Sequence, residues 1–139
     1  RWGHIIMSPP PRSRHAEYQG RIVVILHTLM KGRGRALPEV PLQTSEGVKA
    51  MDVAWVSEER RKSRQNDPCY LVAPEICVEV ESPSNSEEEM MERKRLYFEK
   101  GADEFWLCDQ IGNMQFWDPV GEIPKSTLCP EFPAKVSID

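Results

Sequence analysis

Three polar residues occupy positions where the surrounding sequence calls for apolar side chains: Asp52, Glu79 and Lys94. Asp52 lies in residues 51–56 and Glu79 in residues 74–83, and both segments otherwise have the composition of buried strands. A carboxylate loses its hydration inside such a strand, so it usually has a hydrogen-bonding partner or binds a metal. The sequence therefore predicts that both carboxylates are paired or coordinate a cation.

Lys94 belongs to a segment with helical periodicity. On a helical wheel of about 100° per residue, with the first methionine of the segment at zero, Lys94 falls near 40°. That angle lies inside the arc covered by the apolar residues Met90, Met91, Tyr97 and Phe98, whereas the arginines on either side of Lys94 fall outside it. The wheel therefore predicts that Lys94 faces the core.

Each of these residues also has a simpler interpretation. Asp52 could cap a turn, Glu79 could pair with an arginine, and Lys94 could lie along apolar surface with its ammonium in water. Their combination favours a hydrolytic site, because Mg²⁺ prefers carboxylate and water oxygens and can activate water and polarise a phosphoryl oxygen. A nearby lysine can orient the nucleophile or offset charge in the transition state. Asp52, Glu79 and Lys94 are thus the predicted catalytic set.

Other candidates carry weaker signals. His15 could meet a phosphate or the active site, although a structural or surface role is the simpler interpretation. Glu87 falls near 60° on the same wheel and could reach the site, but an acid in a first helical turn usually serves the helix dipole. Glu81 could be a second ligand or a solvated residue at the strand edge. The sequence has no Walker loop, GxGxxG or GxSxG motif, which disfavours nucleotide-dependent chemistry and serine hydrolysis.

The composition is that of one globular domain over residues 1–139, with 40% hydrophobic and 29% charged residues. No apolar run is long enough to span a bilayer and no segment reads as a signal peptide. The four widely spaced cysteines are expected to be buried thiols of a cytoplasmic protein. The chain begins at Arg1, so further residues are expected upstream. A net charge of −4 is not the footprint of a strong nucleic-acid binder.

Periodicity and turn residues predict an α/β or α+β fold, with a mixed central sheet flanked by helices. A capping box of Ser86 and Glu89 marks the start of the second helix. Ser13 is the expected N-cap of the first helix. The expected elements are a strand at 3–7, a helix at 14–31, a loop and edge strand at 32–46, the two carboxylate strands, a charged surface loop at 58–67, a helix at 86–100, a hairpin of strands at 104–109 and 114–117, and a last strand near 135–138.

Several short motifs run along the chain: residues 3–9 with Arg14 and His15, Asp52, residues 79–84 (EVESPS), Lys94 with Tyr97, and residues 101–109 (GADEFWLCD). Together they resemble the Uma-two-type restriction endonucleases, a branch of the PD-(D/E)XK nuclease superfamily, over nearly the whole chain. Asp52 stands where the family has Pro-Asp. Met51 replaces the proline of the family pattern.

The resemblance implies a restriction-endonuclease-like fold and a metal-dependent endonuclease that hydrolyses DNA, with Mg²⁺ or Mn²⁺ held by Asp52 and Glu79. In the superfamily the lysine stands two residues after the acid, a position that is Glu81 here, and Lys94 would supply the amine instead. The family's opening glutamate would precede Arg1. The acidic charge keeps open an alternative, a catalytically weak module of nuclease fold that acts as an assembly partner.

A homodimer is also predicted. Four aromatic residues crowd the hairpin, namely Phe105, Trp106, Phe116 and Trp117. One sheet face in the core would cover only half of them, so the rest could meet a helix or a second copy of the chain. The family resemblance favours the same assembly.

Overall fold

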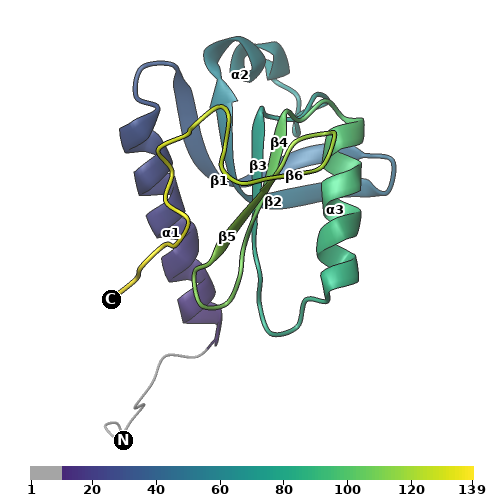
Figure 1. Ribbon diagram of the computed structural model, residues 1–139. Helices are drawn as coiled ribbons and strands as arrows, with labels where there is room; N and C mark the ends of the chain where they lie inside the picture. The colour runs from purple at the N-terminus through teal and green to yellow at the C-terminus, as the bar shows by residue number, and fades with distance from the viewer. Residues whose placement is uncertain (1–10) are drawn as a thin grey trace, which may run out of the picture.

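The computed structural model describes residues 11–139, which form one mixed sheet with helices on both of its faces (Figure 1). The elements in chain order are α1 Pro11–Leu29, β1 Gly34–Thr44, β2 Gly47–Ser57, α2 Glu58–Arg64, β3 Ile76–Val80, α3 Glu87–Glu99, β4 Glu104–Cys108, β5 Met114–Trp117 and β6 Glu122–Ile123. The six strands follow one another in the order of the sequence. Only β3 and β4 are parallel, and α3 is the crossover between them. The predicted fold class is confirmed.

Each face of the sheet carries its own apolar cluster. On one face, Tyr18, Ile22 and Leu26 of α1, together with Met30 directly after the helix, pack against the sheet. On the other face, α3 contributes Met90, Leu96 and Tyr97. Figure 1 shows the sheet between these two helices. The spacing of the α1 residues, four apart, produces the apolar stripe that a helix needs in order to cover a sheet.

The hairpin aromatics are absorbed by these two clusters within one chain. Phe105 and Trp117 lie on the α3 face, while Trp106 and Phe116 lie on the α1 face and contact Phe132 of the C-terminal segment. The four hairpin residues are between 0% and 9% exposed. The crowding that suggested a second copy of the chain is therefore explained without one, and the homodimer stays a prediction.

The helix boundaries differ in part from those expected. The capping box of Ser86 and Glu89 is present, and the second long helix was predicted to within a residue at each end. The first helix begins at Pro11 instead of after Ser13, because proline suits a first helical turn, where its missing N–H is not needed. Residues 58–67, predicted as a loop, contain α2, whose N-cap Ser57 accepts a hydrogen bond from Arg60 N at 3.2 Å.

The strand predictions hold in the centre of the sheet and fail at the tail. The predicted carboxylate strands are β2 and β3, and the hairpin strands are β4 and β5. The segment predicted as a last strand near 135–138 forms only an isolated bridge from Lys135 to Asn113, and the last strand is β6. The predicted strand at 3–7 lies outside the described residues.

An irregularity in β1 and β2 fixes where the candidate site forms. Residues three apart, Leu37 and Val40 in β1 and Met51 and Ala54 in β2, pack against the same apolar cluster, although strand residues normally share a face at every second position. Both strands therefore change face near residues 39 and 52. The cause lies in the backbone of Glu39, whose φ of 53° is left-handed and unusual for a residue other than glycine.

Candidate active site

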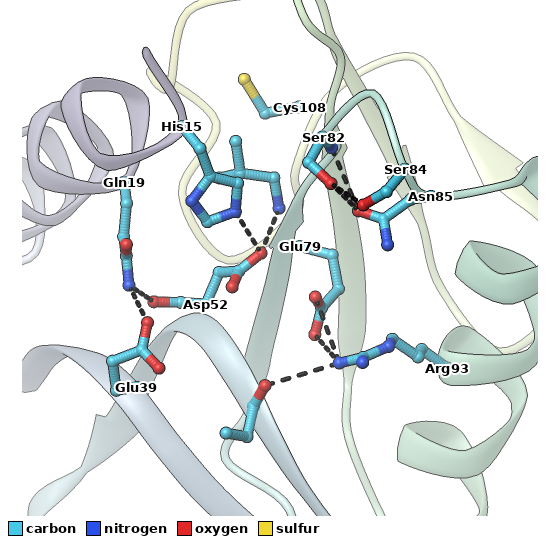
Figure 2. A network of polar contacts seen from close by, with 12 residues as sticks. His15, Gln19, Glu39, Asp52, Glu79, Ser82, Ser84, Asn85, Arg93 and Cys108 are labelled. Carbon is cyan, nitrogen blue, oxygen red and sulfur yellow. Dashed lines mark hydrogen bonds and ion pairs between the residues drawn. The ribbon is translucent and has the colours of Figure 1, made fainter. Parts of the chain in front are cut away.

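The site lies where β2 and β3 separate. Their ladder ends at the pair Val53 and Val78, and one further step of the same register sets Asp52 opposite Glu79. Beyond this point the Asp52 side chain pairs with the β3 backbone: its Oδ2 accepts a hydrogen bond from the backbone N–H of Val80 at 2.8 Å. Separation of the two strands thus creates the space into which both carboxylates project (Figure 2).

Helix α1 holds Asp52 from the other side. His15 Nε2 lies 3.2 Å from Asp52 Oδ2, and Gln19, one turn further along, donates from its amide to the main-chain oxygen of Asp52 at 2.8 Å. The same amide donates to Glu39 Oε2 at 2.6 Å, so Gln19 joins the two residues at which the strands change face. Of the two interpretations open for His15, the structure favours proximity to the active site.

Glu79 is a buried carboxyl group, 2% exposed, with a phenol and a guanidinium as partners. Tyr97 donates its hydroxyl hydrogen to Glu79 Oε2 at 2.6 Å, and Arg93 Nη1 lies 3.4 Å from the same oxygen. Burial, followed by the nearby charge of Asp52, raises the pKa of Glu79 to about 8 against the opposing effects of Arg93 and Tyr97. The two carboxyl groups are therefore close enough to interact strongly.

Arg93, and not Lys94, is the cation in contact with Glu79. The Lys94 ammonium lies 5.4 Å from the centroid of the Trp117 ring, and within residues 11–139 no ion pair of 4 Å or less joins it to a carboxylate. The catalytic role of Lys94 therefore stays a prediction.

The helical wheel placed Lys94 too close to the centre of the buried arc because it omitted Leu96. Leu96 falls near 240° and is 1% exposed, whereas the residues near 80° and 100°, Phe98 and Met91, are only half-buried. The buried arc of α3 is therefore centred toward Arg93, which falls near 300°, and not toward Lys94. The arginine has the length to reach the sheet from that position.

The remaining candidates lie at the margins of the site. Glu81 is half-buried and lines a hollow with His15, so it has turned toward α1. Glu87 is exposed in the first turn of α3, in agreement with the simpler interpretation of that residue. The loop between β3 and α3 is closed by Asn85, whose Oδ1 accepts hydrogen bonds from Ser82 N and Ser82 Oγ at 3.0 and 2.9 Å. These bonds fix the chain directly after the Glu79 strand.

The donor atoms of this site suit a hard divalent cation. Asp52 and Glu79 offer carboxylate oxygens, and Mg²⁺ is commonly held by one or two carboxylates with water completing its shell. Within residues 11–139 no group of three or more His, Cys, Asp or Glu side chains is placed to hold a metal. The repulsion that helps to raise the Glu79 pKa is the feature that a divalent cation would relieve.

His15 was a candidate from the sequence, whereas sequence reasoning missed the contacts of Gln19, Arg93 and Tyr97. Gln19 carried a signal, because it lies four residues after His15 on one helix and shares a face with it. Tyr97 was placed correctly on the buried side of α3 but was assigned to the apolar core. A helical wheel that included Leu96 would have indicated that Arg93 faces the sheet.

Comparison with known proteins gives a family and a fold. A family model described as "Uma2: Putative restriction endonuclease" matches residues 3–118. A similar solved structure is titled as that of a putative nuclease belonging to DUF820 from Anabaena variabilis ATCC 29413, with a TM-score of 0.75 and 21% sequence identity over 99% of this chain and 85% of that chain. At this identity the likeness establishes the fold alone. The comparison with curated proteins gave no match.

One negative finding concerns membranes. Across residues 11–139, no helix combines the length and the apolar character required to cross a bilayer.

Proposed function

Because the chain belongs to the Uma2 family of putative restriction endonucleases, we propose that it is a metal-dependent endonuclease that hydrolyses phosphodiester bonds of DNA. One observation carries the proposal. Asp52 and Glu79, on neighbouring strands, present their carboxyl groups to one another at the point where the strands separate. Acidic oxygens on adjacent strands are a suitable frame for a catalytic cation beside a phosphate.

In this proposal Asp52 and Glu79 hold Mg²⁺ or Mn²⁺. When bound, such an ion supplies a Lewis acid for the phosphoryl oxygen and lowers the pKa of coordinated water. The protein's part is to hold the acids in place. Val80 N and His15 fix the carboxylate of Asp52, and Gln19 fixes its main chain. Glu79 must lose its proton before it binds a cation, and Arg93 stabilises the ionised form.

Helix α3 is proposed to supply the cation that offsets charge in the transition state. The family resemblance assigns this role to Lys94, which lies on the same face of the sheet as Glu79, above Trp117, on a long and flexible stem. Arg93 is the alternative, since it already contacts Glu79. The two residues are adjacent, so paired variants at these positions compare the two directly.

The test is nicking of supercoiled plasmid DNA with Mg²⁺ or Mn²⁺. Asp52→Asn and Glu79→Gln keep the size of each side chain and should abolish cleavage. Glu88→Gln, an exposed acid in the first turn of α3, should cleave like the wild type. Lys94→Met should lower the rate on the order of 10²-fold if Lys94 is catalytic. A wild-type rate in Asp52→Asn would refute the site, and a wild-type rate in Lys94→Met would refute the role of the lysine.

A second candidate function is that of a catalytically weak module with a nuclease fold, which serves as an assembly partner. It is favoured by the pKa of about 8 for Glu79, which leaves this carboxyl group mainly protonated at neutral pH, and by the net charge of −4. A wild-type protein that cleaves DNA with neither metal between pH 7 and 9 would support this candidate over the first.

A further inference from the structure

Two adjoining hollows lie on the α1 side of the candidate active site. They share three lining residues, Arg14, Tyr18 and Gln110. The first hollow also includes His15, whose Nε2 lies 3.2 Å from Asp52 Oδ2, so it opens directly beside the proposed metal ligand. A strand of nucleic acid that reaches the carboxylates from this side would pass over these residues.

The second hollow continues from the first along the C-terminal segment. It is lined by Lys135 and Val136 in addition to the shared residues. Gly112, which packs against two of the lining residues, has a φ of 95°, and a Cβ atom there would lie 2.2 Å from the main-chain oxygen of Val136 and 3.0 Å from the Tyr18 ring. The turn, the tyrosine and the C-terminal segment are therefore held together in one arrangement.

Tyr18 presents a hydroxyl group for which the described residues offer no hydrogen bond. The residue is only 6% exposed, yet it lines both hollows. Buried tyrosine hydroxyls usually have a hydrogen-bonding partner. An oxygen atom of a bound ligand would provide one.

The basic residues and hydrogen-bond donors of the hollows favour an anionic ligand. Arg14 and Lys135 are exposed, and within residues 11–139 neither side chain takes part in an ion pair. Two acidic residues also line the hollows, Glu81 in the first and Asp139 in the second. The other polar groups of the lining include a guanidinium, an ammonium, a phenol and a carboxamide, all of them hydrogen-bond donors.

We propose that these hollows bind a phosphate group of the DNA backbone that neighbours the phosphate to be cleaved. Arg14, Tyr18 and Gln110 would donate hydrogen bonds to its oxygens, and Lys135 would add charge. A guanidinium matches the geometry of phosphate oxygens, and a donor set without base-reading geometry positions the strand without selecting its sequence. This inference rests on the proposed nuclease function.

The experiment measures binding of a fluorescein-labelled DNA duplex by anisotropy at several salt concentrations, in EDTA so that no cleavage occurs. Arg14→Gln should raise Kd about tenfold and reduce the slope of log K against log salt by about 0.9, the value for one lost phosphate contact. Tyr18→Phe should raise Kd about threefold without changing the slope, because the hydroxyl carries no charge. The control is Arg21→Gln, since Arg21 is an exposed arginine two turns further along α1 that lines neither hollow.

The control should keep the wild-type Kd and slope. An Arg14→Gln variant with the wild-type slope, or one no weaker than Arg21→Gln, would overturn the phosphate subsite. If the wild type still nicks plasmid DNA in that case, the proposed nuclease function survives and only the subsite fails. A wild type that neither binds the duplex nor nicks the plasmid overturns both.

Discussion

Removal of Arg93 should destabilise the protein at high pH and hardly at all at low pH. Arg93 Nη1 lies 3.4 and 3.5 Å from the two oxygens of Glu79, and the arginine stabilises only the ionised form of that carboxyl group. Because the Glu79 pKa is about 8, the group is mainly neutral at pH 6 and mainly charged at pH 9. The contribution of the pair to the free energy of unfolding must therefore appear between these two values.

The size of the effect follows from the same geometry. A hydrogen bond to a charged group contributes about 1.5 to 3 kcal/mol, and a change of one unit in pKa corresponds to about 1.4 kcal/mol. The contacts of Arg93 are long and its side chain is 31% exposed, so the lower end of that range applies. We expect Arg93→Met to cost less than about 0.5 kcal/mol at pH 6 and about 1 kcal/mol at pH 9, where protonation of Glu79 limits the loss.

The assay is urea unfolding of the wild type and the variant at both pH values. Methionine keeps most of the aliphatic stem, so lost packing adds little. Lys94→Met is the matched control, because Lys94 is the next residue on α3 and is half-buried, but has no carboxylate partner within 4 Å in the described part of the chain. An equal cost of Arg93→Met at pH 6 and pH 9 would refute the reasoning. A stronger pH dependence in the Lys94→Met variant would do the same.

Three further predictions concern Glu79, Glu104 and assembly. The proton on Glu79 contributes stability that is fully present below its ordinary pKa of 4.5 and is lost as the pH rises through about 8. Binding of Mg²⁺ requires loss of that proton, so its affinity, measured by calorimetry, should rise about tenfold per pH unit from pH 6 to 8; a flat profile would contradict this role. Glu104 is 2% exposed and accepts hydrogen bonds from the Trp106 ring N–H, the Ser126 hydroxyl and the backbone N–H groups of Thr127 and Leu128. Glu104→Ala should therefore lower the free energy of unfolding by about 3 kcal/mol, measured by urea unfolding. A loss below about 1 kcal/mol would contradict this, because it would mean that water replaces the carboxylate as the partner of these donors. Light scattering tests the predicted homodimer, and a monomer at high protein concentration would count against it.

The sequence was informative wherever the signal is local. The capping box of Ser86 and Glu89, the glycine after α3 and the apolar strand segments depend on neighbouring residues, and they predicted the long helices and the central strands correctly. Asp52 and Glu79 were recognised for the same reason, because a charged residue within an otherwise apolar strand segment is costly to bury and stands out from its neighbours in the sequence. Short or weakly patterned elements were missed, among them α2, whose residues are all polar and whose N-cap is a single serine.

Only the tertiary structure decided what surrounds the two acids. His15 and Gln19 reach Asp52 through contacts between segments that are far apart in the sequence. These contacts depend on the left-handed backbone at Glu39, the end of the β2–β3 ladder and the packing of α1. Which of Arg93 and Lys94 contacts Glu79 likewise depends on how α3 is rotated against the sheet, which the packing of Leu96 sets. A sequence can show that a charge is buried, whereas its partners depend on contacts between segments that lie far apart in the chain.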